Sequence, residues 1–449
     1  MLTTLQKGRK PMQLKVVKFG GSSLADAEHF KQVASIIKAD PSRRYVIASA
    51  PGKRGNDDEK VTDMLYNCYN MIRNREDINE YYQKIIDRYI SIISGLGIDF
   101  DITGELEYIK NAMMARSGRD YAASRGEYLN SIILAKYLGF DFVDAENVIF
   151  FKENSEFDEE KTNEAMKAEL SKHKNAVIPG FYGTMPNGTI KTFSRGGSDI
   201  TGAIVARAVD ADLYENWTDV SGFMMADPKV IENALPISLI TYRELRELSY
   251  NGATVLHEDS IFPVQKEGIT INIRNTNHPE DKGTLIVPIA NNYESEHIIT
   301  GIAGKKGFSV INIEKNRMGS EFGFAARVFK CLDQYGIHTE HLASGIDSMS
   351  HIVSTAELNC KIEEFIPELH RITEADNITV DTGLALVAVV GRGMKETKGT
   401  ASRIFTAISN AGVNVRMIDQ GASELNIVIT VYESDYEKTI KAIYDEFVK

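Results

Sequence analysis

The chain has 449 residues, of which 43% are hydrophobic and 25% charged, as in a globular protein with a substantial core. Its length favours about three domains. The 51 Lys and Arg against 63 Asp and Glu give a net charge of -12 without a basic cluster, so nucleic acid and anionic membranes are poor partners. The cysteines, Cys68, Cys331 and Cys360, fit neither a disulfide framework nor a zinc pattern, and we interpret them as free thiols in a reducing cytoplasm.

Residues 1–11 form a polar, basic segment that lacks the apolar core of a signal peptide. No apolar run in the chain approaches membrane-spanning length. We therefore expect a flexible leader and a cytoplasmic protein.

The first element is the stretch Val16–Ser23 (VVKFGGSS), an extended apolar run that carries Lys18 and breaks on two glycines. It predicts a strand, a Gly-Gly turn and a helix with Ser22 or Ser23 as its N-cap. Bare backbone N–H groups beside a fixed cation favour a polyphosphate ligand. A strand–turn–helix with a merely exposed lysine is an equal alternative for this motif alone. Helical spacing continues through Phe30, Val33, Ala34 and Ile37.

Arg44–Ala50 predicts a second buried strand, which is followed by the charged loop Lys53–Lys60 (KRGNDDEK) and a helix that begins near Thr62. Ligands of open α/β sheets bind at the carboxyl ends of the strands. If the two strands are parallel neighbours, Ser49 and Thr62 therefore lie close to the Gly-Gly turn. The following residues, to about Asp120, read as a helical scaffold.

Ser124–Glu127 (SRGE) predicts the start of another helix, in which Glu127 is most simply a first-turn glutamate favoured by the helix dipole. The second glycine motif is Thr192–Asp199 (TFSRGGSD), before a helix over Ile200–Val209. Arg195 and Asp199 bracket its glycines, and a guanidinium can hold a carboxylate or phosphate in a bidentate fork.

A repeat begins after Ile298, because Gly336–Gly345 aligns with Gly412–Gly421. Each copy predicts strand, helix, strand, strand, helix, the pattern of a duplicated small α+β domain. The second copy stops after its last helix, whereas the first copy has a spare strand before it, Ile298–Lys305. We expect that spare strand to pair into the second copy, so that the first copy is inserted inside the second and no sheet edge stays open.

The motifs KFGGSS, SRGGSD, TDVSG and ADP, in this order and before a tandem repeat, resemble those of aspartokinases, amino-acid kinases with C-terminal ACT domains. Gln420–Ile427 is similar to the QGSSE-x-NI run of their last ACT domain. The resemblance implies an open, mostly parallel α/β kinase domain at 12–297. It also implies two α+β (βαββαβ, ferredoxin-like) ACT domains, the first at 306–382 and the second formed by 298–305 plus 383–449.

The resemblance further implies phosphorylation of the L-aspartate β-carboxylate by MgATP, the first step toward lysine, threonine and methionine. The implied catalytic residues are Lys18 and Asp199, and Mg²⁺ would bind through the ATP phosphates and not through protein side chains. Phosphate and nucleotide contacts are implied for Gly20, Gly21, Ser22, Thr218, Asp219, Asp227 and Lys229. The implied aspartate pocket comprises Ser49, Thr62, Glu127 for the α-ammonium, Arg195 for the α-carboxylate, Gly197 and Ser198.

Regulation is implied at the first ACT domain. Relatives pair such domains side by side, which predicts a homodimer or a dimer of dimers with an amino-acid effector, L-lysine by our hypothesis, at the seam. The residues expected to hold it combine carboxylates, hydroxyls and exposed backbone: Met318, Ser320, Glu321, Thr339, Glu340, Ser344 and Gly345.

The chain departs from the family pattern at three places. Thr254 stands where many relatives carry a lysine that helps to hold the phosphates, and we consider Lys229 or Lys266 as its replacement. Lys229 itself replaces an arginine, and the loop Lys53–Lys60 is an insertion. Two alternatives stay open: another amino-acid kinase, of the glutamate or N-acetylglutamate type, and a catalytically dead amino-acid sensor, which only Thr254 supports.

Overall fold

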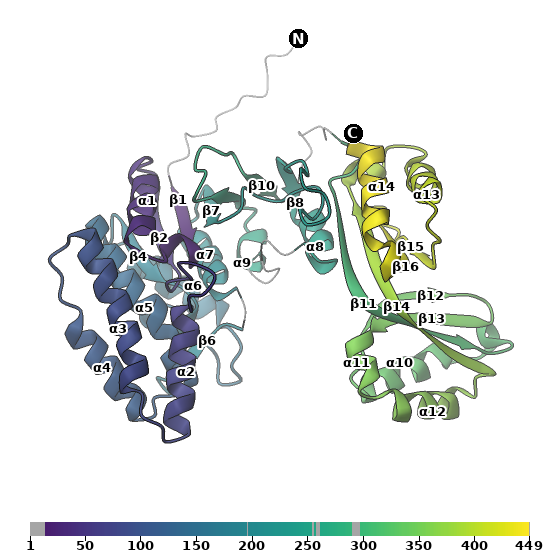
Figure 1. Cartoon of the computed structure of the whole chain (residues 1–449), viewed down its shortest axis with the longest axis horizontal. Coiled ribbons are helices and arrows are strands. Elements are labelled where there is room, and N and C mark those ends of the chain that lie inside the picture. Colours follow the sequence, from purple (N-terminus) through teal and green to yellow (C-terminus); the bar gives the residue numbers. More distant parts are fainter. Residues whose placement is uncertain (1–13, 195, 254–255, 257–260, 290–296, 449) are drawn as a thin grey trace, which may run out of the picture. The chain divides into compact units, whose positions relative to one another are not determined.

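The computed structural model describes residues 14–448 except 195, 254–255, 257–260 and 290–296 (Figure 1). The chain divides into two compact units. Unit 1 comprises Met1–Phe223, Ser238–Tyr242 and Val255–Ala290, and unit 2 comprises Met224–Ile237, Arg243–Thr254 and Asn291–Lys449. Two segments inside the range expected for the N-terminal domain thus belong to the second compact unit.

Among the described residues of unit 1, eight strands form an open sheet in which only the pair β9–β10 is antiparallel. Strands β1 and β2 are parallel neighbours, as the interpretation of the glycine turn required. The strands, in spatial order, are β3 (Asp141–Phe142), β4 (Ala176–Pro179), β2 (Arg43–Ala48), β1 (Lys15–Phe19), β7 (Leu213–Thr218), β9 (Thr270–Asn275), β10 (Thr284–Val287) and β8 (Leu239–Thr241). A separate hairpin joins β5 (Tyr182–Thr184) to β6 (Ile190–Thr192).

Alternation along the strands sorts side chains between the two faces of this sheet. Val17 and Phe19 of β1 and Trp217 of β7 enter one apolar core with α1–α5. The residue between the two apolar positions of β1, Lys18, lies on the opposite face and pairs with Asp199 in α7. The helices of unit 1 are α1 (Ala27–Lys38), α2 (Val61–Arg73), α3 (Asn79–Leu96), α4 (Thr103–Met114), α5 (Arg119–Leu138), α6 (Glu159–Leu170), α7 (Gly197–Ala208) and α9 (Phe262–Gln265).

Two helix starts differ from the sequence prediction. Ser22–Leu24 form a short 3-10 turn, and the N-cap of α1 is Asp26, whose carboxylate accepts hydrogen bonds from the N–H groups of residues 28 and 29. A carboxylate at this position satisfies two of the free N–H groups of the first turn. Glu127 lies inside α5, which begins at Arg119, so it is not a first-turn glutamate.

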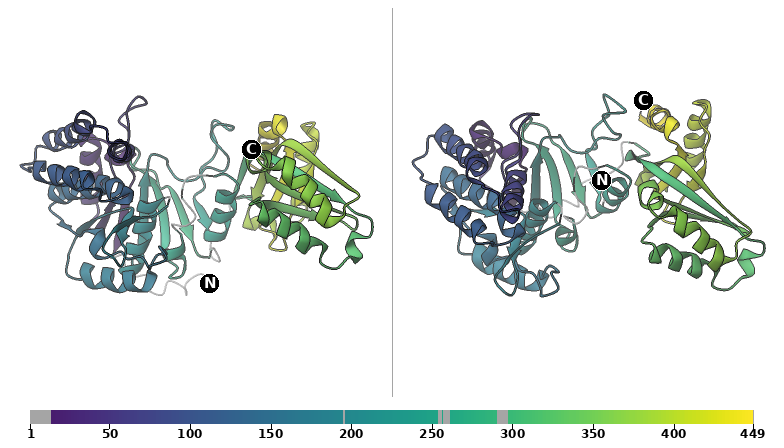
Figure 2. Two further views of the ribbon diagram at one scale, coloured as in Figure 1. Left: turned by 90° about the horizontal axis from the view of Figure 1, so that it is seen from below. Right: turned by 60° about the horizontal axis from the view of Figure 1, so that its bottom comes forward.

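Unit 2 contains one six-stranded antiparallel sheet in the order β12-β13-β11-β14-β16-β15. Strands β11 (Gly301–Glu314) and β14 (Asn377–Val390) are each 14 residues long and run side by side through both copies of the repeat, as the two long green arrows of Figure 2 show. Gly301–Lys306 pair with Ala385–Val390, the strand at the start of the second copy. The shorter strands are β12 (Thr339–Ser344), β13 (Ser348–Ser354), β15 (Met417–Asp419) and β16 (Asn426–Tyr432).

Helices of the first copy cover its part of the sheet and enclose a core that includes Ile311, Val328 and Phe365. The helices of the two copies are α10 (Phe324–Gln334), α11 (Thr355–Asn359), α12 (Ile362–Thr373), α13 (Thr400–Asn410) and α14 (Tyr436–Val448). Helix α8 (Tyr242–Tyr250) belongs to the same unit from Arg243 onward. Its buried Glu244 accepts hydrogen bonds from Thr300 and Arg392.

No helix in the described part of the chain is long and apolar enough to cross a membrane.

The three cysteines are free thiols, and burial raises the pKa of Cys68 to about 12. A thiol with such a pKa stays protonated and unreactive at neutral pH.

Candidate active site

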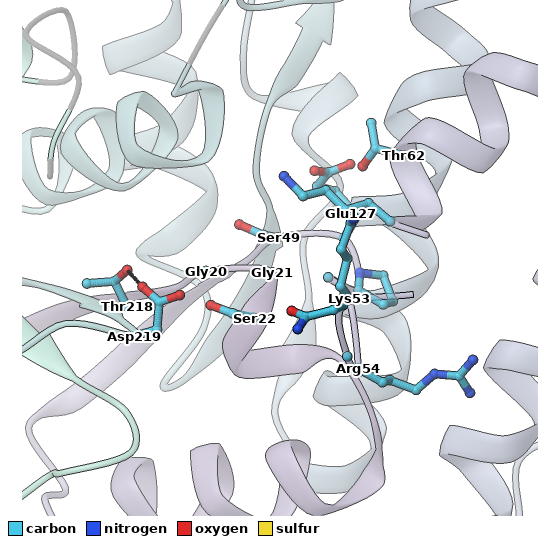
Figure 3. Close-up of a pocket in the computed structure, with 16 residues that line it drawn as sticks. Gly20, Gly21, Ser22, Ser49, Lys53, Arg54, Thr62, Glu127, Thr218 and Asp219 are labelled. Atoms are coloured by element: carbon cyan, nitrogen blue, oxygen red, sulfur yellow. Dashed lines mark hydrogen bonds between the residues drawn. The ribbon is translucent and has the colours of Figure 1, made fainter. Parts of the chain in front are cut away.

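A cavity of about 620 Å³ opens at the carboxyl ends of β1, β2 and β7 (Figure 3). Its wall contains most of the residues singled out in the N-terminal half of the sequence, which come from five separate segments. They are Gly20, Gly21 and Ser22 after β1, Ser49 after β2, Thr62 on α2, Glu127 on α5, and Thr218 and Asp219 at the end of β7. The structure therefore gathers these eight residues around one space.

The Gly20–Gly21 turn is held by its neighbours on both sides. Gly20 N donates to Trp217 O at 3.0 Å, and Gly52 N donates to Gly21 O at 2.8 Å. A Cβ atom on Gly21 would lie 2.8 Å from Ala50 O, which no side chain tolerates without backbone movement. Glycine is thus required here because two chain segments cross at backbone distance.

Lys18 lies beneath this turn and is largely buried. Its Nζ is 2.5 Å from Asp199 Oδ1 and 3.4 Å from Asn216 Oδ1, while Asn216 Nδ2 donates to Asp199 at 2.9 Å. The three side chains form a closed network that fixes the ammonium in one place. Asn216 was not singled out from the sequence, although its position on β7 beside β1 follows from the register.

Glu127 is the cavity's buried acid, with only 6% of the residue exposed. Its Oε2 has no hydrogen-bond partner among the described residues, while a backbone N–H from Ala50 contacts the carboxyl group. Burial raises the pKa of Glu127 to about 8. A buried carboxyl group with an unused oxygen is a natural partner for a ligand ammonium, which would stabilise its ionised form.

The cavity also has a wall that the sequence analysis did not assign. Lys53, Arg54, Asn56 and Lys60, all from the charged loop after β2, line it together with the backbone at Gly52. The sequence contains evidence for this wall, because the loop follows the carboxyl end of the strand that precedes Ser49. The sequence analysis, however, treats the loop only as an insertion.

Several of the predicted site residues that the structure describes are not part of this cavity wall. Gly197 and Ser198 are buried at the start of α7. Asp227 and Lys229 belong to unit 2, where Asp227 Oδ1 accepts a hydrogen bond from Lys229 N at 2.9 Å in the expected turn. Arg195 lies outside the described residues, as does Thr254.

The residues predicted to bind an effector come from two turns of unit 2. Gly319 N donates to Ile346 O at 2.9 Å, which joins the turn Met318–Ser320 to the β12–β13 turn. Glu321 forms ion pairs with Lys315 at 2.7 Å and with Arg327. The other predicted residues, Thr339, Glu340, Ser344 and Gly345, lie on or directly after the edge strand β12. The two predicted loops are thus neighbours within the first copy of the repeat.

Among the described residues, no group of three or more His, Cys, Asp or Glu side chains could hold a metal ion. Lys266, one candidate for the missing phosphate-binding cation, is on the surface and pairs with Glu159 at 3.2 Å.

Comparisons with known proteins agree with this architecture. Residues 13–275 match the model of the amino acid kinase family, and residues 387–447 match an ACT domain. Aspartokinase 3 of Bacillus subtilis is 36% identical over 458 residues, which cover 97% of this chain and 98% of that protein.

Two solved structures are similar over nearly the whole chain. The aspartate kinase of Clostridium acetobutylicum, described as an allosteric enzyme, is 51% identical with a TM-score of 0.90, covering 97% of this chain and 100% of that chain. Aspartokinase III of E. coli, solved with aspartate and ADP, is 25% identical with a TM-score of 0.75, covering 96% and 99%.

The open, mostly parallel sheet with its glycine turn and buried lysine defines an amino-acid kinase. The chain belongs to the amino acid kinase family and, within it, to the aspartokinases. It is a phosphotransferase that acts on aspartate under allosteric control.

Proposed function

We propose that the cavity binds L-aspartate and MgATP and transfers the γ-phosphoryl group to the aspartate β-carboxylate, giving 4-phospho-L-aspartate. One observation carries the proposal: the wall of a single cavity contains both the Gly20–Gly21 turn, beside the paired Lys18, and Glu127, whose Oε2 has no hydrogen-bond partner among the described residues. The first end suits a phosphoryl group, and the second suits an α-ammonium. No general base is needed, since the attacking carboxylate is already ionised at neutral pH.

At the phosphate end, Lys18 contacts the transferring group, whose negative charge spreads over its oxygens in the transition state. Asp199 and Asn216 hold the ammonium so that it need not reorganise during transfer. The N–H groups of the glycine turn and Ser22 add donors. On the nucleotide side we assign Thr218, Asp219, Asp227 and Lys229 as contacts. Mg²⁺ enters with the ATP phosphates, since this ion usually binds through substrate phosphates and few protein carboxylates.

At the substrate end, Glu127 takes the α-ammonium and Arg195 clamps the α-carboxylate, while Ser49 and Thr62 line the cavity on the side of Glu127. Gly197 and Ser198 shape the buried start of α7 behind it. An N-acetylated substrate has no ammonium and would leave Glu127 without a partner. This argues against the N-acetylglutamate alternative.

A coupled assay of ADP release tests this function with L-aspartate, L-glutamate and N-acetyl-L-glutamate as acceptors, together with trapping of the acyl phosphate by hydroxylamine. We expect turnover and a hydroxamate with aspartate alone. Turnover only with another acceptor would show a different kinase, and no ADP release with any acceptor would favour the sensor alternative.

We further propose that the enzyme works at the head of lysine, threonine and methionine synthesis in the cytoplasm, as a homodimer or dimer of dimers. L-Lysine is the proposed effector, bound where the turns at Met318–Ser320 and Gly345 meet beside the edge strand β12. We keep the ACT boundaries at 306–382 and at 298–305 plus 383–449. Calorimetry with lysine and threonine tests the effector, because tight binding of threonine alone would contradict it.

A further inference from the structure

We propose that the loop 53–60 is a phosphate-binding element whose Lys53 and Lys60 hold the γ-phosphoryl group of the nucleotide; this inference rests on the proposed kinase function. The loop lines the cavity through Lys53, Arg54, Asn56 and Lys60. Three observations lead to this proposal: how the loop is anchored, where its charges point, and which residue caps the helix after it.

A buried arginine, Arg88, anchors the loop through hydrogen bonds to Gly52 and Asp58. Arg88 of α3, with 3% of its side chain exposed, donates to Gly52 O at 3.0 Å and to both carboxylate oxygens of Asp58 at 2.8 and 2.6 Å. Arg54 pairs with the same carboxylate at 3.0 Å, and its guanidinium points away from the Gly20–Gly21 turn (Figure 3). These hydrogen bonds hold the pKa of Asp58 well below its usual range, so the anchor is charged at any working pH.

The loop separates its charges by sign. Asp58 forms ion pairs with Arg54 and Arg88. Glu59 accepts hydrogen bonds from Tyr81 and Asn67, both at 2.7 Å. None of the loop's carboxylates lines the cavity, whereas its lysines do. Within the described part of the chain, neither Lys53 nor Lys60 has a carboxylate partner. A loop with equal numbers of acids and bases therefore presents a positive face to the cavity.

Lys60 occupies a position that disfavours a cation. It is the N-cap of α2, where Ser, Thr, Asp or Asn normally accepts a hydrogen bond from the first turn. A lysine cannot accept one, and its charge lies at the positive end of the helix dipole. The first turn of α2 contains one acid, Asp63, and an anion bound between Lys60 and the helix terminus would offset the remaining penalty.

The position of the loop selects which anion it holds. Lys53 directly follows Gly52, whose N–H bonds to the phosphate-side Gly21, whereas Lys60 starts the helix that carries the substrate-side Thr62. The group that passes between nucleotide and aspartate is the γ-phosphoryl group. The pair of lysines thereby supplies the positive charge that Thr254 cannot.

The test compares Lys53→Met, Lys60→Met and the double variant with wild type by titration calorimetry. The ligands are ADP, an ATP analogue with a non-hydrolysable β–γ bond, and L-aspartate. We expect each single variant to lose about tenfold in affinity for the analogue and the double variant about a hundredfold, because each loses a charged hydrogen bond. Affinity for ADP and for aspartate stays within about twofold, because neither carries a γ-phosphate.

Lys136→Met is the matched control, because Lys136 is an exposed lysine of the same unit that does not line the cavity. Lys53→Arg should keep most of the affinity, and fluorescence of Trp217 verifies that each variant is folded. Unchanged binding of the analogue by the double variant would overturn the inference, as would a loss confined to aspartate. A wild-type protein that binds no nucleotide would instead overturn the proposed function itself.

Discussion

Replacing Glu127 by glutamine should stabilise the ligand-free protein while damaging its use of aspartate. Burial raises the pKa of Glu127 to about 8, against 4.5 for an exposed glutamate. Between these values the folded state keeps a proton that the unfolded chain has lost, so stability falls as pH rises through this window. At pH 7 the penalty is about 3 kcal/mol.

Glutamine has no charge to bury, so the variant escapes this penalty. Its amide loses some hydrogen bonds of its own, and we therefore expect a net stabilisation of about 1–2 kcal/mol at pH 7. The gain should vanish near pH 4.5 and grow toward pH 8. For substrate binding the sign is opposite, because an ammonium pairs with the ionised carboxylate. The wild-type KM for aspartate should fall as pH rises toward 8, and the variant's KM should be higher and nearly independent of pH.

Urea unfolding followed by fluorescence provides the measurement, since Trp217 is the sequence's only tryptophan and is packed in the core of unit 1. Unfolding curves and KM values at pH 5, 6, 7 and 8 give both dependences. Glu107→Gln, an exposed substitution on α4, is the matched control. A Glu127→Gln variant with wild-type pH dependence of stability would refute the reasoning.

Four further outcomes are expected. Lys18→Ala and Asp199→Ala each lower kcat about a hundredfold or more in steady-state assays, the scale for one preorganised charge. Arg195→Ala raises the KM for aspartate and leaves ATP affinity near wild type; the reverse pattern would contradict the carboxylate clamp. Burial lowers the pKa of His351 to about 4. Between pH 6.5 and 4 the unfolded chain binds a proton at this residue that the folded state does not bind, so the free energy of unfolding falls by about 3 kcal/mol over this range. His351→Phe should flatten this dependence in circular-dichroism melts. Ser344→Ala relieves lysine inhibition with uninhibited kcat unchanged, and persistent inhibition would exclude this seam.

The proposed phosphate end of the site could be predicted from the sequence because it depends on local geometry. A strand that breaks on Gly20–Gly21 exposes backbone N–H groups, and strand alternation places Lys18 on one known face. The neighbouring strand then brings Ser49 to the same edge of the sheet, as the structure shows.

The substrate end was less accessible because it depends on tertiary burial. The residues alone predict a first-turn position for Glu127, and only the family resemblance links it to the substrate. In the structure, α5 begins eight residues earlier and carries Glu127 into the interior. The sequence predicts Ser22 or Ser23 as the N-cap of α1, but the chain first makes a 3-10 turn that moves the cap to Asp26. Likewise, the sequence of the loop after β2 does not reveal that Arg88, from a later helix, pairs with Asp58 of the loop. It therefore does not reveal that Lys53 and Lys60 line the cavity.

The two long strands of unit 2 bring the two ends of the first copy of the repeat next to each other. Lys306 and Ala385 are directly opposed on β11 and β14, and the whole first copy lies between them in the chain. A short hairpin turn that joined these two positions would leave the second copy's sheet paired. In terms of chain connectivity, the first copy replaces a single β-turn of the second copy's sheet, and any site that it carries could be deleted without rebuilding that sheet.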